Sequence, residues 1–250
     1  MAPQFDDDYV LPLTRVRVGD VPTRVLAVGD PARVRKAATR LTDVREAGSN
    51  REYVTVIGRY CGTEVAIVSH GVGSAGAAVC FEEMCRGGAQ RIIRSGTAGG
   101  LQPEVRDGSV VVATGAVREE GISRQLVPLA FPAVADPALV MSLRGHAADA
   151  GVPVHGGIVL TSDCFYPGPV LDVDHRLWQR AGCVAVEMEL AALFVTAALH
   201  GVQAGGILAI DGNPLDENDS DMSNYEPFRD VVDRAVDAAL EAALAALIDA

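Results

Sequence analysis

A strand, turn, helix and strand in succession over residues 69–100 constrain the fold of this chain more than any other feature. An apolar run ends in the glycine-rich sequence Ser69–Gly76. A helix is then predicted over Ala75–Arg86, and a strand over Arg91–Arg94 leads into a second glycine-rich sequence, residues 95–100. Parallel neighbouring strands need such a crossover helix. The pattern therefore predicts a β-α-β unit with a glycine-rich turn at the end of each strand.

Short apolar strands alternate with helices along the rest of the chain. We expect strands over 25–28, 50–57, 63–68, 110–114, 157–160 and 206–210, and helices beginning at 31 and spanning 137–150, 187–200 and 227–248. This alternation is typical of a sheet covered on both faces. It predicts an α/β fold: one domain over residues 1–250, built as a three-layer sandwich with a mixed, mostly parallel central sheet.

The sequence predicts a hairpin at one connection between elements and an active-site lid at another. The strands 50–57 and 63–68 are predicted to pair as a hairpin around Gly58 and Gly62. The acidic run 213–226 follows a core strand directly, and a long polar loop in that position is interpreted as an active-site lid.

Charge and cysteine content exclude several classes of protein. A formal charge of −12 disfavours nucleic acid and anionic membrane surfaces as partners. No run reaches the roughly 18 apolar residues of a membrane span, and the acidic start Met1–Asp8 does not resemble a signal peptide. Five cysteines without a C-x-x-C pair favour the cytoplasm. The five histidines show no metal-ligand spacing, so no metal is expected.

The first glycine-rich sequence matches a dinucleotide-binding motif. Gly71, Gly73 and Gly76 spell G-x-G-x-x-G between a strand and a helix. That motif also needs an acidic residue about twenty positions later, at the end of the next strand, and this chain has Arg94 there. An arginine could instead hold the 2′-phosphate of NADP, so an NADP-binding oxidoreductase remains an alternative.

The competing interpretation is a compact phosphate site. Arg94 and Thr97 would meet Gly29 and Arg33, because guanidinium groups bind phosphate oxygens in a planar fork and glycines let the backbone approach. Asp30-Pro31 is typical of a helix start. Arg33 would then lie in the first helical turn, where a cation is unfavourable unless an anion is also bound. A solvated surface arginine is the alternative.

Seven motifs in order carry a resemblance to a known family. They are Gly29-Asp30-Pro31 with Arg33, Asn50-Arg51-Glu52-Tyr53, Ser69-His70-Gly71-Val72-Gly73, Arg94-Ser95-Gly96-Thr97, Phe131-Pro132-Ala133-Val134, Ser162-Asp163-Cys164-Phe165-Tyr166-Pro167 and Val186-Glu187-Met188-Glu189. From residue 25 to the last helix, the chain resembles the hexameric purine nucleoside phosphorylase and uridine phosphorylase superfamily. It most resembles the apicomplexan purine nucleoside phosphorylases.

This resemblance implies a pentosyltransferase that uses inorganic phosphate and no organic cofactor. The implied reaction is the reversible phosphorolysis of purine ribonucleosides or 2′-deoxyribonucleosides, such as inosine and guanosine, to free base and (deoxy)ribose 1-phosphate. Gly29, Arg33, Arg94 and Thr97 would bind phosphate, and Arg51 would reach the phosphate site of a neighbouring subunit. The implied assembly is a homo-hexamer, a trimer of dimers.

The resemblance assigns the ribose to Val72, Glu187, Met188 and Glu189. Glu189 would accept from the 2′- and 3′-hydroxyls, a task that suits a carboxylate, and Glu187 would have a lesser role. If both glutamates begin the predicted helix 187–200, they lie roughly 200° apart around it and on different faces.

The base would be bound by Phe165 or Tyr166, through stacking, and by Asp211. Asp211 is the candidate general acid at N7 of a leaving purine, which requires that burial raise its carboxyl pKa. The alternative for Asp211 is a turn-forming Asp-Gly. Arg94 is assigned a catalytic part too, because the phosphate it holds stabilises the positive charge that develops on the sugar.

Two departures from the family pattern bear on the substrate. The positions at which uridine phosphorylases bind the uracil edge hold Pro169 and Leu171 here. No histidine precedes His70, although the family uses an N-terminal histidine from a neighbouring subunit at the ribose 5′-hydroxyl; residues 10–14 are Val-Leu-Pro-Leu-Thr. An apolar 5′ pocket could admit a methylthio group. Uridine phosphorylase, 5′-methylthio-purine phosphorylase and a non-catalytic nucleoside-binding protein remain alternatives.

Overall fold

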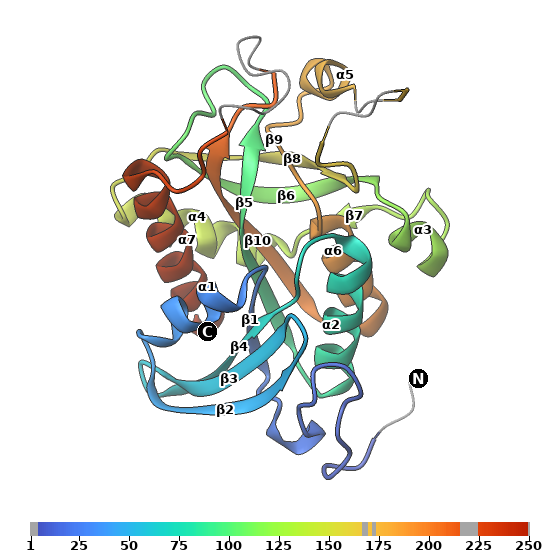
Figure 1. Cartoon of the computed structure of the whole chain (residues 1–250), viewed down its shortest axis with the longest axis vertical. Coiled ribbons are helices and arrows are strands. Elements are labelled where there is room, and N and C mark those ends of the chain that lie inside the picture. The colour runs from blue at the N-terminus through green and yellow to red at the C-terminus, as the bar shows by residue number, and fades with distance from the viewer. Residues whose placement is uncertain (1–4, 167–169, 172–173, 216–224, 250) are drawn as a thin grey trace.

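The computed structural model describes residues 5–166, 170–171, 174–215 and 225–249, and it has a mixed sheet with helices on both faces (Figure 1). The strands are β1 (Arg24–Val28), β2 (Thr42–Asn50), β3 (Tyr53–Tyr60), β4 (Thr63–Ser69), β5 (Arg91–Gly100), β6 (Val110–Glu119), β7 (Ala133–Val134), β8 (Val154–Ser162), β9 (Ala185–Glu187) and β10 (Gln203–Gly212). The helices are the 3₁₀ helix η1 (Val18–Asp20), α1 (Pro31–Ala38), α2 (Ser74–Arg86), α3 (Ile122–Leu126), α4 (Pro137–Asp149), α5 (His175–Arg180), α6 (Leu190–His200) and α7 (Asp230–Ile248).

Two hydrophobic cores lie on opposite faces of this sheet. Along β1, Val25 and Ala27 join the core that contains α2 and α6, whereas Leu26 and Val28 join the core beneath α1, α4 and α7. Successive side chains of a strand point to opposite faces. Both faces of the central strands are therefore buried, which explains why these strands are continuous apolar runs rather than alternating ones.

The sheet contains parallel and antiparallel pairs. Strands β4, β1, β5 and β10 lie side by side and parallel, and β6, β8 and β9 form a second parallel set. Antiparallel pairing of β10 with β6 and of β5 with β9 joins the two sets into a closed ring, while β3 and β2 extend the open edge. The predicted α/β fold with a mixed central sheet is confirmed. The ring closure was not predicted.

The predicted turn over residues 95–100 was wrong. Strand β5 continues to Gly100, and it pairs with β10 as far as Gly99. The glycines serve close approach instead of a turn: a Cβ atom on Gly100 would lie 2.1 Å from the Val105 carbonyl oxygen, and one on Gly96 would lie 2.3 Å from Nη1 of Arg94, which would have to move.

Three further boundaries differ from the sequence expectation. The hairpin of β3 and β4 turns at Cys61 and Gly62, and Gly58 lies inside β3. Strand β2 was missed, because its alternation is weak and most of its residues are exposed. Helix α6 begins at Leu190, and Glu187 ends strand β9. Most of the proposed lid, residues 216–224, lies outside the described residues.

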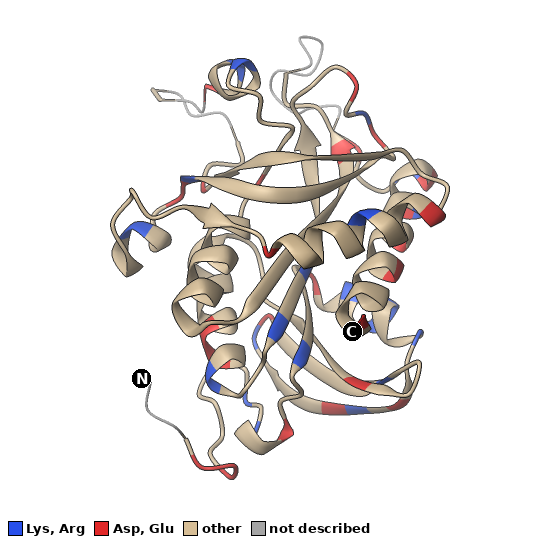
Figure 2. Cartoon of the chain, turned by 180° about the vertical axis from the view of Figure 1, so that it is seen from behind, with Lys and Arg blue, Asp and Glu red and all other residues tan. Residues whose placement is uncertain are grey.

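The predicted start of α1 and the extents of α2 and α4 are confirmed. The carboxylate of Asp30 caps α1 by accepting from the Ala32 backbone N–H at 2.7 Å, and Pro31 is the first helical residue. Seen from behind, Lys or Arg positions and Asp or Glu positions alternate along the ribbon (Figure 2). Among the helices that the structure describes, none combines the length and apolarity needed to cross a membrane.

Candidate active site

A cavity of about 830 Å³ opens where the carboxyl ends of the parallel strands meet. Ligands of α/β proteins bind at this edge of the sheet. Most of the residues singled out in the sequence line it: Gly29, Arg33, Val72, Arg94, Thr97, Phe165, Glu187, Met188, Glu189 and Asp211. The fold thus gathers into one cavity side chains that are up to 182 residues apart in the chain.

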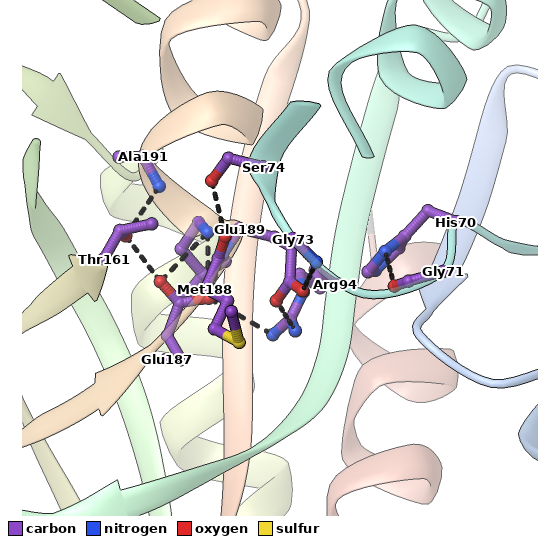
Figure 3. Close-up of polar contacts among 11 residues, drawn as sticks. His70, Gly71, Gly73, Ser74, Arg94, Thr161, Glu187, Met188, Glu189 and Ala191 are labelled. Atoms are coloured by element: carbon purple, nitrogen blue, oxygen red, sulfur yellow. Dashed lines mark hydrogen bonds and ion pairs between the residues drawn. The ribbon is translucent and has the colours of Figure 1, made fainter. Parts of the chain in front are cut away.

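Arg94 lies at the centre of the cavity wall. It projects from β5, where it pairs with Ala27 on one side and Gly206 on the other, and its side chain is only 5% exposed. The guanidinium donates from Nη2 to the Glu189 carboxylate, and its Nη1 lies 3.5 Å from Oε2 of Glu187 (Figure 3). Arg94 therefore pairs with both glutamates, which approach it from the same side of the cavity.

Glu189 is held between Arg94 and the start of helix α2. Its Oε1 accepts from the Gly73 backbone N–H at 2.7 Å, and Gly73 adopts a φ of +93° that a residue with a side chain rarely takes. The Ser74 hydroxyl donates to the carbonyl of Met188 and fixes the neighbouring backbone. The positive end of a helix favours a carboxylate at this place.

Glu187 has a different environment. Its carboxylate accepts from the backbone N–H groups of Glu189 at 2.8 Å and Leu190 at 2.9 Å and from the Thr161 hydroxyl, so it caps the start of α6. Burial raises the pKa of Glu187 to about 7, with Arg94 opposing the rise and Glu189 adding to it. The expectation of two glutamates on different faces of one helix was wrong, because neither lies within α6.

The cavity also holds unsatisfied cationic groups. Within the described part of the chain, Nε and Nη1 of Arg94 have no hydrogen-bond partner, and Arg33 has no hydrogen bond or ion pair. Burial and the nearby charge of Arg94 lower the pKa of Arg33. Buried N–H groups without an acceptor are costly, and an anion between the two guanidinium groups would accept from them and remove that cost.

His70 lies behind the same wall, fully buried against Phe81. Its Nδ1 lies 2.9 Å from the Gly71 carbonyl oxygen, which fixes a proton on that nitrogen, and its Nε2 has no partner among the described residues. Burial, together with the charges of Arg94 and Arg33, lowers the pKa of His70 well below its usual value. His70 is therefore neutral and adds no charge to the cavity.

Asp211 is the penultimate residue of strand β10 and is buried. Burial raises the pKa of its carboxyl, while hydrogen bonds from Tyr225 and Thr97 and the charge of Arg33 oppose the rise. The Tyr225 hydroxyl donates to Oδ2 of Asp211 at 2.8 Å. The environment that a general acid requires is thus present.

The aromatic residues of the cavity come from two segments. The Phe165 ring lines the cavity and lies 6.0 Å from the Tyr225 ring, edge to face. Tyr166 packs on the outer side of Phe165, is 70% exposed and is not part of the cavity lining. Arg51 is exposed in the connection between β2 and β3, also outside the lining.

Sequence reasoning missed Tyr225, Arg229 and Asp107. All three line the cavity. Arg229 forms an ion pair with Asp107 at 2.5 Å and donates to the Asp211 carbonyl at 3.2 Å, so it connects the loop between β5 and β6 with the end of β10. The sequence analysis placed Tyr225 only within the acidic run 213–226, and no local signal marks Arg229 or Asp107. In the part of the chain that the structure describes, no group of side chains has the composition of a metal site.

Fold and site together define an α/β protein that can bind an anion between two arginines, beside carboxylates able to accept from a polyol. Residues 23–248 match the family model described as "Phosphorylase superfamily". The chain belongs to this superfamily, which confirms the resemblance.

Several proteins that are similar to this chain are named nucleoside phosphorylases. The chain is 42% identical to purine nucleoside phosphorylase of Plasmodium falciparum over 201 residues, 80% of this chain and 82% of that protein. It is 39% identical to uridine phosphorylase of Treponema pallidum over 207 residues, 79% and 80% of the two chains. The crystal structure of Toxoplasma gondii purine nucleoside phosphorylase in complex with immucillin-H superposes with a TM-score of 0.89 at 32% identity, covering 95% of each chain. The chain is therefore a member of an enzyme family that acts on nucleosides and phosphate.

Proposed function

We propose that this protein is a purine nucleoside phosphorylase, which cleaves inosine, guanosine and their 2′-deoxy forms with inorganic phosphate. The observation that carries the proposal is the pair formed by the half-buried Arg33, which has no partner among the described residues, and the buried Arg94, whose Nε and Nη1 have no hydrogen bond; both share one cavity with Glu189 and Asp211. The similarity to proteins named purine nucleoside phosphorylase supports the choice of base.

Phosphate would lie between Arg33 and Arg94, with the backbone at Gly29 and the Thr97 hydroxyl completing the site. Guanidinium groups donate in pairs to phosphate oxygens. The phosphate oxygen attacks the anomeric carbon as the bond to the base breaks, and the dianion stabilises the positive charge on the sugar. Arg51 would complete this site from a neighbouring subunit, consistent with its position outside the cavity of its own chain.

The ribose would lie against Val72 and Met188, with its 2′- and 3′-hydroxyls on Glu189. Glu189 already accepts from the Gly73 N–H and Arg94, so its carboxylate is fixed before the sugar arrives. Glu187 contributes indirectly, because it caps α6 and thereby holds the backbone of Glu189. This capping agrees with the lesser role that the resemblance gives it.

The base would stack on Phe165, with Tyr166 behind it, and meet Asp211 at N7. A protonated Asp211 gives its proton to N7, so the O–H bond breaks as the N–H bond forms and the electron pair of the glycosidic bond stays on the base. Burial of Asp211 supports this step, because it raises the pKa of the acid.

Three further properties belong to the same proposal: a homo-hexamer built as a trimer of dimers, phosphate as co-substrate with no organic cofactor, and a cytoplasmic location. The exposed Arg51, which lies outside its own cavity, supports assembly. The cysteines of the chain are all free thiols, which suits a reducing compartment.

Phosphate-dependent release of free base tests the proposal. The protein would be incubated with inosine, guanosine, adenosine, 5′-methylthioinosine and uridine, with and without phosphate, and free base quantified. We expect release from inosine and guanosine only when phosphate is present. Release from uridine alone would favour a uridine phosphorylase, and preference for 5′-methylthioinosine over inosine would favour a 5′-methylthio-purine phosphorylase. No phosphate-dependent release would refute the proposal.

Substitution of Asp211 tests the mechanism. Asp211→Asn should slow inosine cleavage by about two orders of magnitude or more, because a general acid contributes that much, and should leave nucleoside affinity nearly unchanged. Asp237→Asn, on the outer surface of α7, is the matched control and should retain full activity. Equal rates for the two variants would exclude Asp211 as the acid.

A further inference from the structure

Tyr225 makes a direct contact with the candidate acid that the proposed mechanism does not use. Its hydroxyl donates to Oδ2 of Asp211 at 2.8 Å, although the two residues are separated by 14 positions and lie in different segments. Asp211 belongs to β10, whereas Tyr225 precedes α7. The contact is mostly buried, and both residues line the cavity.

Several contacts fix the Tyr225 ring. Phe165 lies edge to face with it, with ring centroids 6.0 Å apart. The ring also covers Gly212, where a Cβ atom would come within 3.2 Å of Cε2, so the glycine after the acid allows the ring to approach.

Arg229 holds the segment that follows Tyr225. It donates to the Glu226 carbonyl at 2.8 Å and to the Asp211 carbonyl at 3.2 Å, and it forms an ion pair with Asp107. The start of α7 is thereby connected to the acid through backbone and side chain together. Tyr225 is consequently part of a fixed arrangement and not a surface residue in chance contact.

We propose that Tyr225 is the positioning residue of the general acid: it holds Oδ2 of Asp211, so that the other carboxyl oxygen faces the base and carries the proton. This inference rests on the proposed function, because it assumes that Asp211 protonates a purine. As the proton moves to N7, the carboxylate that forms is stabilised by the Tyr225 hydroxyl. The hydroxyl thus acts on the product side of the proton transfer, where it lowers the barrier.

The acidity of Asp211 should depend on this hydroxyl. A hydrogen bond to the charged form of a carboxyl lowers its pKa, and the Tyr225 bond is the largest of the effects that oppose the rise caused by burial. Removal of the hydroxyl therefore raises the pKa of Asp211. The charged and titratable groups around the carboxyl are Arg33 from α1, Asp107 from the β5–β6 connection, Tyr225 itself and Arg229. Arg33, Asp107 and Arg229 remain in place when only the hydroxyl is removed from the Tyr225 ring.

Tyr225→Phe tests the proposal through the pH dependence of kcat/KM for inosine between pH 6 and 10. We expect kcat to fall about tenfold at the optimum, because the acid is no longer held toward the base. The alkaline limb, where the acid loses its proton, should move up by about one pH unit, the size of one hydrogen bond to a charged group. KM for inosine should change less than kcat.

Tyr60→Phe is the matched control. The Tyr60 hydroxyl donates to a carboxylate too, Oε1 of Glu241 at 2.6 Å, on the outer side of α7 and away from the cavity. It should leave both the rate and the alkaline limb unchanged. A loss of folded protein would lower the apparent rate of either variant without moving the limb, so the pH profile separates positioning from stability.

The outcomes distinguish this inference from the function on which it rests. If the wild type releases base and Asp211→Asn does not, but Tyr225→Phe retains the wild-type limb and rate, the positioning role is refuted and the function stands. A shift of the alkaline limb of Tyr225→Phe to lower pH would also refute the positioning role. If the wild type shows no phosphate-dependent cleavage, the proposed function itself fails.

Discussion

The two arginines of the cavity should have opposite effects on stability when each is replaced by methionine. Methionine keeps much of the apolar stem and removes the charge. Arg94 pairs with Glu187 and Glu189, whose side chains are 0% and 5% exposed. Arg33 has no such partner in the described residues, and the lowered pKa of its side chain means that folding disfavours its charge.

The expected change in the free energy of unfolding depends on which carboxylates lose their ion-pair partner when an arginine is replaced. Removing one partner of a buried ion pair costs about 3–5 kcal/mol. Glu187 limits that cost, because its pKa is already about 7 and rises further without Arg94. Protonation of Glu187 at pH 8 therefore costs only about 1.4 kcal/mol for each unit by which the pH exceeds its pKa. Glu189 keeps the Gly73 N–H. We expect Arg94→Met to lose about 3 kcal/mol at pH 8 and less at pH 6.

Arg33→Met removes a half-buried charge that is repelled by Arg94, so its stability should equal or slightly exceed that of the wild type. Both variants should still lose phosphate affinity by roughly one to two orders of magnitude, because each removes charge-assisted hydrogen bonds to the anion.

Urea denaturation at pH 6 and pH 8 measures the difference. The buffer must be free of phosphate, since an anion that binds the folded state would stabilise the wild type and obscure the comparison. The reasoning is refuted if the two variants are destabilised equally, or if the loss in Arg94→Met does not shrink at pH 6. KM for phosphate gives the second readout.

Three other substitutions have definite expected outcomes. The contribution of Glu187 to stability should be lost as the pH rises from about 4.5 to 7, because Glu187 binds its proton more tightly in the folded state. Urea midpoints across this window should therefore fall less steeply, or rise more steeply, with pH in Glu187→Gln than in the wild type, whose buried neutral His70 acts in the opposite direction. Asp237→Asn breaks an ion pair with Arg40 that is partly exposed, so it should cost less than about 1 kcal/mol, and the cost should vanish in 1 M salt. Thr14→Val removes a buried hydroxyl that donates to the Glu83 carboxylate at 2.7 Å, so it should lower the free energy of unfolding by about 1.5 kcal/mol, measured by thermal unfolding. A loss below about 0.3 kcal/mol would show that this hydrogen bond does not anchor the N-terminal segment.

The β-α-β core was predictable because its signals are local. Apolar runs such as 25–28 and 65–68 are buried on both faces, and the cap at Asp30 sets where α1 begins. Glycine patterns were less informative. Those at 95–100 indicate a turn when read along the chain, yet in the fold Gly96 lies against Arg94, Gly99 against Pro214 and Gly100 against Val105, contacts that arise only after folding.

The site divides in the same way between sequence and tertiary structure. Sequence motifs identified many of the residues that line the cavity: Arg33, Arg94, Glu189 and Asp211 were all found. Their motifs are short and continuous, so they can be read from the chain alone. The sequence thereby determined the family and many of the residues that line the cavity.

Only the tertiary structure decided how these residues act on one another. The pairing of Arg94 with two glutamates, the capping role of Glu187 and the contact of Tyr225 with Asp211 join segments that no local pattern connects. The physical reason is that a buried charge takes its pKa and its orientation from whichever groups packing brings within a few ångströms. That set is fixed by ring closure of the sheet and by the docking of α7, and neither is encoded within any one motif.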